Sequence, residues 1–124
     1  MAVLMHHLPQ QGQIMAFKDK ILALSSVALT PIAYTDKTTG EKAFIKRMTL
    51  SEREAYARAV TNAPAGKSNA TGFAHIMVDQ NGNRIFGDND IDAIGNLPDN
   101  VVFDALEVFN KGAEPTSIEQ AEKN

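Results

Sequence analysis

The densest group of side chains able to do chemistry lies in VDQNGNRIFGDNDID, residues 78 to 92, where four aspartates and three asparagines surround two glycines. A calcium-binding EF-hand loop that began at Asp79 would have oxygen ligands at its first, third and fifth positions. The sixth position of such a loop requires glycine and here holds Arg84, and the twelfth requires a bidentate glutamate and holds Asp90. Because these two positions set the geometry and charge of the site, the stretch does not predict a metal site.

The same stretch has the composition of a turn followed by the start of a helix. Asn81-Gly82 is typical of a tight turn, because glycine readily adopts a positive φ. Gly87 or Asp88 can then cap a short helix that carries Ile91 and Ile94 toward the core. The aspartates in the first turn of that helix are favoured by the positive end of its dipole. We therefore expect the acidic stretch to be structural.

The other candidate catalytic groups also have simpler structural explanations. Asp88 and Asp92 share one helical face, but an exposed helix start does not desolvate a carboxyl group, as an acid/base site requires. Gly66-Lys67-Ser68 matches the end of a nucleotide-binding loop, whereas the first glycine of that motif would fall at Thr61. His75 stands alone in an apolar run, as expected of a hydrogen-bonded core imidazole. We predict no catalytic residues, no metal site and no cofactor, and expect that the protein is not an enzyme.

The composition of the chain argues against several classes of function. It has 124 residues, 44% of them hydrophobic and 22% charged, as expected of one globular domain with a modest core. A net charge of -3 provides no basic field for phosphate backbones, so nucleic acid is not an expected partner. The sequence has no cysteine, no apolar run long enough to cross a membrane and no secretion-signal pattern at its start. We expect a cytoplasmic protein with no membrane partner.

The beginning of the chain predicts a flexible leader and then a short helix. Residues 1 to 14 are rich in glutamine and lack sustained periodicity, so order is expected to begin near Met15. In AFKDKILALSS, apolar side chains recur at helical spacing, at Phe17, Ile21, Leu22 and Leu24.

A β-hairpin and a helix are predicted next. Residues 27 to 35 and 42 to 48 favour extended chain, and the turn sequence DKTTG between them contains Gly40, which is free to adopt a positive φ. The following helix has two candidate capping boxes, Thr49 with Glu52 and Ser51 with Glu54, and ends before Pro64.

Two segments of the C-terminal half differ in how clearly they predict structure. GFAHIMV, within residues 70 to 78, is too short and too evenly apolar to distinguish a buried helix from a strand. DNVVFDALEVFNKG, residues 99 to 112, predicts a helix with an acidic first turn and a Lys-Gly stop. One face of that helix carries the residues expected to enter the core: Val102, Phe103, Leu106 and Phe109.

Together these elements predict a small, mainly helical α+β domain over residues 15 to 112, with an N-terminal β-hairpin. The last segment, residues 113 to 124, offers only Ile118 and Ala121 to bury and is expected to form a weakly ordered helix or tail. Since the last helix has too few apolar residues to close a core by itself, we expect the apolar surface left over near Ile118 and the hairpin to contact partners, with Phe109 and Ile118 as the contact residues.

The order of these signals resembles a family, the tail assembly chaperones of long-tailed bacteriophages and prophages. The resemblance spans roughly residues 15 to 124 and is carried by KDKILALSS, RMTLSERE, DQNGNRIFGDNDIDAIGNLP and the final EKN. It implies a non-enzymatic assembly factor that keeps the long helical tape measure protein soluble, helps recruit tail tube subunits and is absent from the mature virion. A homo-oligomer is compatible with this role.

The resemblance also implies a second, longer product made by a backward slip of the ribosome near the end of the frame. Glu122-Lys123-Asn124 can be encoded by GAA AAA AAC, which permits such a slip without requiring it. Two other classes of function remain open at this point: a divalent-cation-binding regulatory module and a structural tail completion protein.

Overall fold

The computed structural model describes residues 11 to 112 and has an α+β fold. Helices predominate, and the described strands form one small antiparallel sheet. The elements, in chain order, are α2 (Gln11–Ala23), η1 (Leu24–Ser26), β1 (Ile32–Thr35), β2 (Lys42–Ile45), α3 (Leu50–Thr61), α4 (Ser68–Ile76), β3 (Met77–Val78), η2 (Asp88–Asp90), α5 (Ile91–Ile94) and α6 (Asp99–Gly112).

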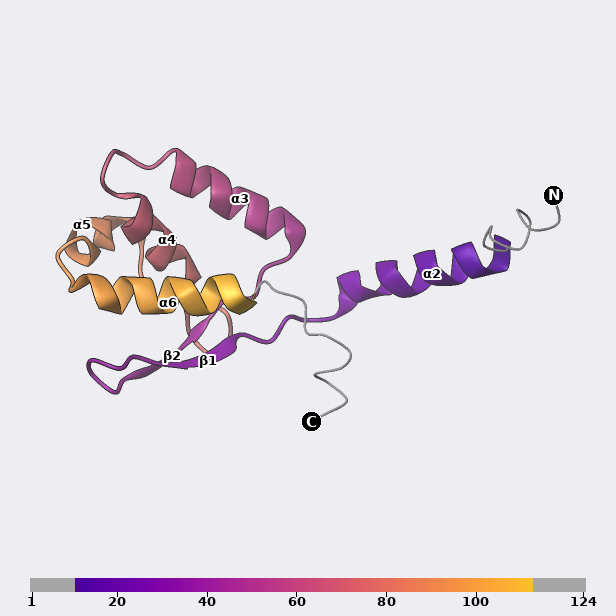
Figure 1. The fold of residues 1–124 in the computed structure, drawn as a ribbon. Helices are drawn as coiled ribbons and strands as arrows, with labels where there is room; N and C mark the ends of the chain where they lie inside the picture. The colour runs from indigo at the N-terminus through magenta and orange to yellow at the C-terminus, as the bar shows by residue number, and fades with distance from the viewer. Residues whose placement is uncertain (1–10, 113–124) are drawn as a thin grey trace.

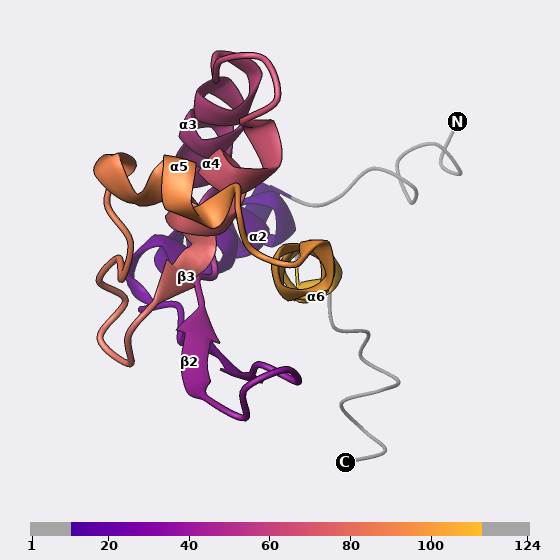
Figure 2. The same ribbon diagram turned by 90° about the vertical axis from the view of Figure 1, so that its left-hand side faces the viewer.

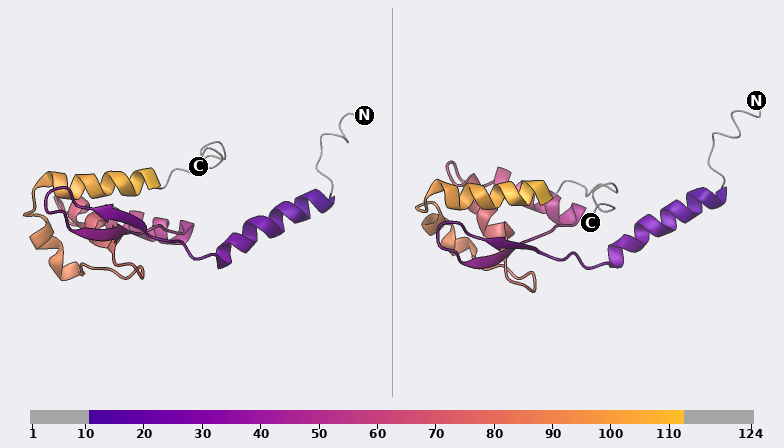
Figure 3. Two further views of the ribbon diagram at one scale, coloured as in Figure 1. Left: turned by 90° about the horizontal axis from the view of Figure 1, so that it is seen from below. Right: turned by 60° about the horizontal axis from the view of Figure 1, so that its bottom comes forward.

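The molecule divides into a body, residues 31 to 112, and an N-terminal arm, which we define as residues 11 to 30. The body stacks α3, α4 and α6 beside the sheet, and the arm extends away from it on the side opposite the turn of the β1–β2 hairpin (Figure 1). Two further views show the same separation of α2 from the rest of the described chain (Figure 3). The predicted helix is therefore present, but no part of the body covers it.

The sheet confirms the predicted hairpin and extends it by one strand. β1 and β2 pair antiparallel with Ile32 opposite Ile45, and β2 pairs antiparallel with β3 through Ile45 and Met77. The hairpin turn is held by Asp36, whose carboxylate accepts hydrogen bonds from the backbone N–H and the hydroxyl of Thr39. These bonds lower the pKa of Asp36.

Helix α3 begins at one of the two predicted capping boxes. The Thr49 hydroxyl accepts from the Glu52 N–H at 3.2 Å, and a Glu52 carboxylate oxygen accepts from the Thr49 N–H at 3.0 Å. The reciprocal pair satisfies two backbone donors that a helix start otherwise leaves open. The alternative box at Ser51 does not form, because Ser51 already lies inside the helix.

The segment that the sequence left undecided is a helix and then a strand. It forms the last turns of α4 and, from Met77, strand β3. The helix is buried along most of its length and contacts α3, α5 and α6, which makes it the central element of the body. An evenly apolar run suits this position, because α4 meets a neighbour on nearly every side.

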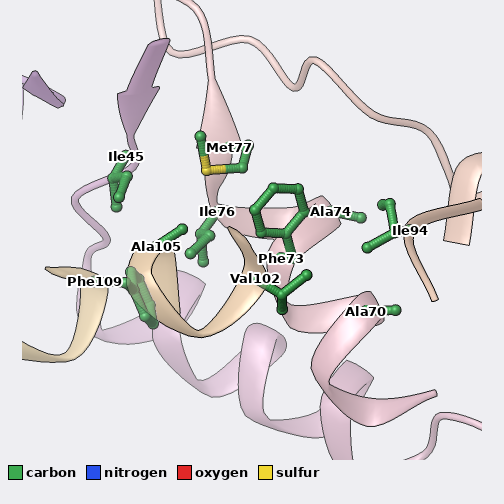
Figure 4. Packing of buried hydrophobic residues seen from close by; sticks show 10 residues of the cluster. All are labelled: Ile45, Ala70, Phe73, Ala74, Ile76, Met77, Ile94, Val102, Ala105 and Phe109. Atoms are coloured by element: carbon green, nitrogen blue, oxygen red, sulfur yellow. The ribbon is translucent and has the colours of Figure 1, made fainter. Parts of the chain in front are cut away.

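The core lies between α4, α6 and the inner face of the sheet (Figure 4). Side chains from all three elements and from α5 point into it in the close-up view. α6 is seen along its axis in Figure 2, with α3, α4 and α5 on one side of it. The buried cluster comprises Ile45, Ala70, Phe73, Ala74, Ile76, Met77, Ile94, Val102, Ala105 and Phe109.

Helix α6 has the predicted bounds, but its buried face differs from the predicted one. Val102 and Phe109 are buried and Leu106 is half-buried, whereas Phe103 is 49% exposed. The buried face is centred on Val102, Ala105 and Phe109, and Phe103 lies roughly a third of a turn away from that centre. Ala105, which was not among the predicted core residues, is fully buried on this face, and α6 packs against α4.

Candidate functional site

The arm carries the largest run of exposed apolar side chains in the described chain. Every residue from 14 to 30 is exposed, and Phe17 is 67% exposed. Apolar side chains in water favour association with other apolar surface, and extended exposed patches mark sites of interaction. The exposed large hydrophobic residues of the arm are Ile14, Met15, Phe17, Ile21, Leu22, Leu24, Val27 and Leu29.

These residues form rows along α2 because of their spacing. Ile14, Phe17, Ile21 and Leu24 follow one another at intervals of three, four and three residues, which places them on one face of a helix. Met15 and Leu22, seven residues apart, form a second row. Leu24 lies in η1, which continues α2 without a break.

The charges of α2 lie beside these rows. By helical geometry, Lys18 falls between the two apolar rows and Lys20 falls on the other flank of the longer row. Neither lysine has an ion pair or hydrogen bond with another described residue. Asp19 lies near the opposite face of the helix. The apolar surface of the arm is therefore bordered by unpaired positive charge.

The base of the arm lines a hollow on the body. The hollow has a volume of about 290 Å³, and its lining includes the apolar Val27, Leu29 and Pro31 and the charged Lys46, Arg47 and Glu52. Lys46 donates to Glu52 at 3.0 Å. The backbone N–H of Thr49, together with Lys46, holds the pKa of Glu52 below its usual value. Apolar surface thus continues from α2 to the junction with β1.

Of the two residues predicted as partner contacts, only Phe109 lies within the described range, and it is not part of this surface. Phe109 is 3% exposed and packs in the core against Tyr56, with ring centroids 4.9 Å apart, while the Arg53 guanidinium lies 4.3 Å from its ring centre. Phe109 therefore lies in the core, as its place on the core face of this helix predicted, and it is not exposed for the partner contact that was also predicted for it. Ile118 lies outside the described residues.

The boundary predicted at Met15 also changes. α2 begins at Gln11, so residues 11 to 14 belong to the helix and not to a loose leader. Ile14 opens the longer apolar row, although the predicted boundary placed it in the leader. The signal that identifies it is the regular three-four-three spacing, which starts at Ile14 and not at Phe17.

The acidic stretch has the structural roles expected of it. One Asp79 carboxylate oxygen accepts from the N–H groups of Asn81 and Asn83, at 2.9 and 3.0 Å, around a turn in which Gly82 has φ +86°. Asp90 accepts from the Gly87 N–H at 2.8 Å. Among the described residues, no group of three or more His, Cys, Asp or Glu is placed to hold a metal ion.

The remaining sequence candidates are accounted for by local contacts. Asp88 pairs with Arg84 at 3.2 Å, whereas Asp92 pairs with Lys67, so the two carboxylates have different cationic partners. That same Lys67 precedes α4 at its N-cap. His75 donates through Nδ1 to the Thr71 carbonyl oxygen at 2.8 Å, as a hydrogen-bonded imidazole should.

No helix in the described range 11 to 112 is long and apolar enough to cross a membrane. A scan against models of protein families finds no match to the chain, and searches of curated proteins and of solved structures find none either. The arm is the candidate functional site because its apolar rows are exposed and its lysines have no partner among the described residues.

Proposed function

We propose that this protein is a tail assembly chaperone of a long-tailed phage or prophage. In this role it binds the tape measure protein, keeps it soluble and helps recruit tail tube subunits, without catalysing a reaction. It acts in the cytoplasm of the bacterial host and is absent from the mature virion. The proposal combines the order of sequence signals described above with the exposed arm.

The observation that carries the proposal is the exposure of the apolar face of α2. An isolated helix shorter than about 12 to 15 residues is marginal in water. α2 has 13 residues and no covering contact from the body, so its apolar rows do not contribute to the body's own core. Such a helix suits a protein that gains its remaining contacts from a partner.

A tape measure protein is a suitable partner on physical grounds. A very long amphipathic helix exposes apolar stripes along its length, and these aggregate unless they are covered. A small domain with one projecting helix covers a short stretch, and many copies would cover the whole. Each contact can then be weak, because many contacts on one chain act together.

Co-expression with the tape measure protein of the same phage tests the proposal. The wild-type chain should increase the soluble fraction of the tape measure protein, and Ile21→Asp should abolish the increase because it places a charge in the apolar row. Ala16→Asp is the matched control, since it adds the same charge to the opposite side of α2 and should leave the increase intact.

Purified particles provide an independent comparison. An assembly factor should be absent from them, whereas a tail completion protein would be present in a fixed number of copies. An unchanged soluble fraction of the tape measure protein, or stoichiometric amounts of this chain in virions, would contradict the proposed function.

A further inference from the structure

We infer that the arm selects its partner by charge, binding a helix whose apolar seam is flanked by acidic residues. The inference rests on the proposed function in taking the partner to be a long helix, and it adds the chemistry by which that helix is recognised. It is carried by the juxtaposition of Lys18 and Lys20 with the row formed by Ile14, Phe17, Ile21 and Leu24.

The spacing of the long row favours a helical occupant. Intervals of three, four and three residues are those of core positions in two successive heptads, so the row fits between the side chains of a second helix that crosses at a small angle. In that register Lys18 and Lys20 occupy the two positions that flank the seam. These flanking positions set partner choice in paired helices, because their side chains meet across the interface.

The location of Lys18 makes the charge requirement stronger. It lies between the longer row and the second row, Met15 and Leu22, so a partner that covers both rows also covers the Lys18 ammonium group. A covered ammonium group without a counter-charge is costly, whereas a carboxylate on the partner forms a charge-assisted hydrogen bond with it. A partner with lysine or arginine at the facing positions would add repulsion to this cost.

A second copy of the arm fits this surface less well. In an antiparallel pair of arms, Lys18 would face Lys18 of the other copy, and no glutamate occurs in the arm to offset it. Whether the two arms pair parallel or antiparallel, the surface buried along two heptads is small compared with the area of about 1,200 Å² or more that a stable dimer buries. A longer acidic helix that several arms bind in succession avoids both problems.

A membrane surface also fits less well. A helix that lies on a bilayer needs a continuous apolar face with its cations along the borders. In α2, Lys18 interrupts the apolar face between its two rows, and Asp19 leaves the arm with a net charge of only +1, from two lysines and one aspartate.

Two synthetic helical peptides test the inference with the full-length protein. Both carry the same leucine and isoleucine seam over several heptads; one has glutamate at all flanking positions and the other has lysine. Fluorescence anisotropy should show the acidic peptide binding about tenfold tighter, because each facing position changes from attraction to repulsion. The difference should shrink at high salt, as screening predicts for exposed charges.

Variants assign that preference to the arm. Lys18→Glu with Lys20→Glu should reverse the preference, so that the basic peptide binds tighter. Lys37→Glu with Lys42→Glu is the control, because it makes the same change of net charge on the exposed hairpin and should leave the preference unchanged. Phe17→Asp should weaken the binding of both peptides.

Several results would overturn the inference. These are equal binding of the two peptides, no binding of either, an arm-dependent affinity for vesicles of anionic phospholipid that exceeds the affinity for the acidic peptide, or dimerisation of the free chain that Phe17→Asp abolishes. The inference and the proposed function can fail separately. If the protein solubilised the tape measure protein but bound both peptides equally, the proposed function would hold and the charge selection would be wrong. If it preferred the acidic peptide but did not solubilise the tape measure protein, the charge selection would hold and the proposed function would be wrong.

Discussion

At the scale of single residues, Gly72 shows how closely the helices of the body pack. A Cβ atom at this position would lie 2.9 Å from the Tyr56 hydroxyl oxygen and 3.4 Å from Leu106 Cδ2. Tyr56 cannot swing away freely, because its ring packs against Phe109 in a tilted arrangement and the Arg53 guanidinium lies 5.7 Å from its ring centre. Glycine in the middle of α4 thus permits the close approach of α3.

We expect Gly72→Ala to lower the free energy of unfolding by about 1 kcal/mol, since the clash outweighs the better helix propensity of alanine. In a Tyr56→Phe background the hydroxyl is gone, and the same Gly72→Ala change should become neutral or stabilising. Urea denaturation of the four proteins measures this coupling. Additive effects would show that the Tyr56 hydroxyl does not limit this contact.

Glu52 should make the stability of the protein depend on pH. Its pKa is lowered in the fold by the Thr49 N–H and by Lys46, from an ordinary value of 4.5. A lowered folded pKa means that its stabilising effect is complete above about pH 4.5 and is lost as the pH falls through the folded value. Glu52→Gln should flatten the loss of thermal stability on acidification, and Glu54→Gln serves as the control for the removal of one negative charge from α3. If the melting temperatures of the wild type and of Glu52→Gln fell in parallel with decreasing pH, Glu52 would not be the group responsible.

A substitution at Gly82 should destabilise the protein more than a substitution at Asp90 in η2. Gly82→Val forces a branched side chain into a positive φ and should destabilise the protein by about 1 to 2 kcal/mol. Asp90→Asn keeps an acceptor for the Gly87 N–H and should cost less than about 1 kcal/mol. Thermal melts measure both changes, and added calcium should leave the melting temperature of the wild type unchanged. An increase of several degrees with calcium would mean that the acidic stretch binds metal.

At the scale of elements, the arm and the body should respond differently to loss of an aromatic side chain. Phe109→Ala opens a cavity in the core and should cost about 3 to 5 kcal/mol. Phe17→Asp changes an exposed residue that no body element covers, so the melting temperature of the body should shift by little. A large loss of stability in Phe17→Asp would mean that α2 packs against the body in solution.

The same contrast explains what the sequence could and could not predict. The bounds of α6, the hairpin with its turn and the Thr49 capping box follow from local patterns, since helix periodicity, turn residues and caps act over a few neighbouring residues. The change from α4 to β3 at Met77 has no such signal, because a run buried on all sides has no periodicity. Phe103 and Ala105 show a third case, because the side of α6 that is buried depends on how the helix packs in the fold and not on its own sequence alone.

The site was harder to predict than the fold. The periodicity of Phe17, Ile21 and Leu24 predicted a helix correctly, but an apolar stripe in a sequence has the same appearance whether the protein's own core or another molecule covers it. For the same reason, the sequence does not show that the apolar side chain of Phe109 is covered by the protein's own core. Only the arrangement of the elements shows that α6 is covered and α2 is not (Figure 1).

At the scale of the whole molecule, the part of the chain from residue 11 to 112 consists of a small packed body and one helix, α2, that the body leaves uncovered. The hydrophobic core lies entirely within the body, so we expect the body to fold without the arm. The arm, in contrast, has apolar rows, unpaired lysines and a length at which helices are marginal, so its stability should depend on its partner. This division is what the proposed function requires, since the arm would bind the partner while the body remains folded.

Amide hydrogen exchange on the full-length protein, alone and bound to the tape measure protein, tests this account most directly. In the free protein the amides of α2 should exchange rapidly while those of α4 and α6 are protected. In the complex, protection should appear across residues 14 to 24, and the body should change little. Rapid exchange of α2 in a stable complex, with new protection confined to the body, would contradict the claim that the arm is the binding element.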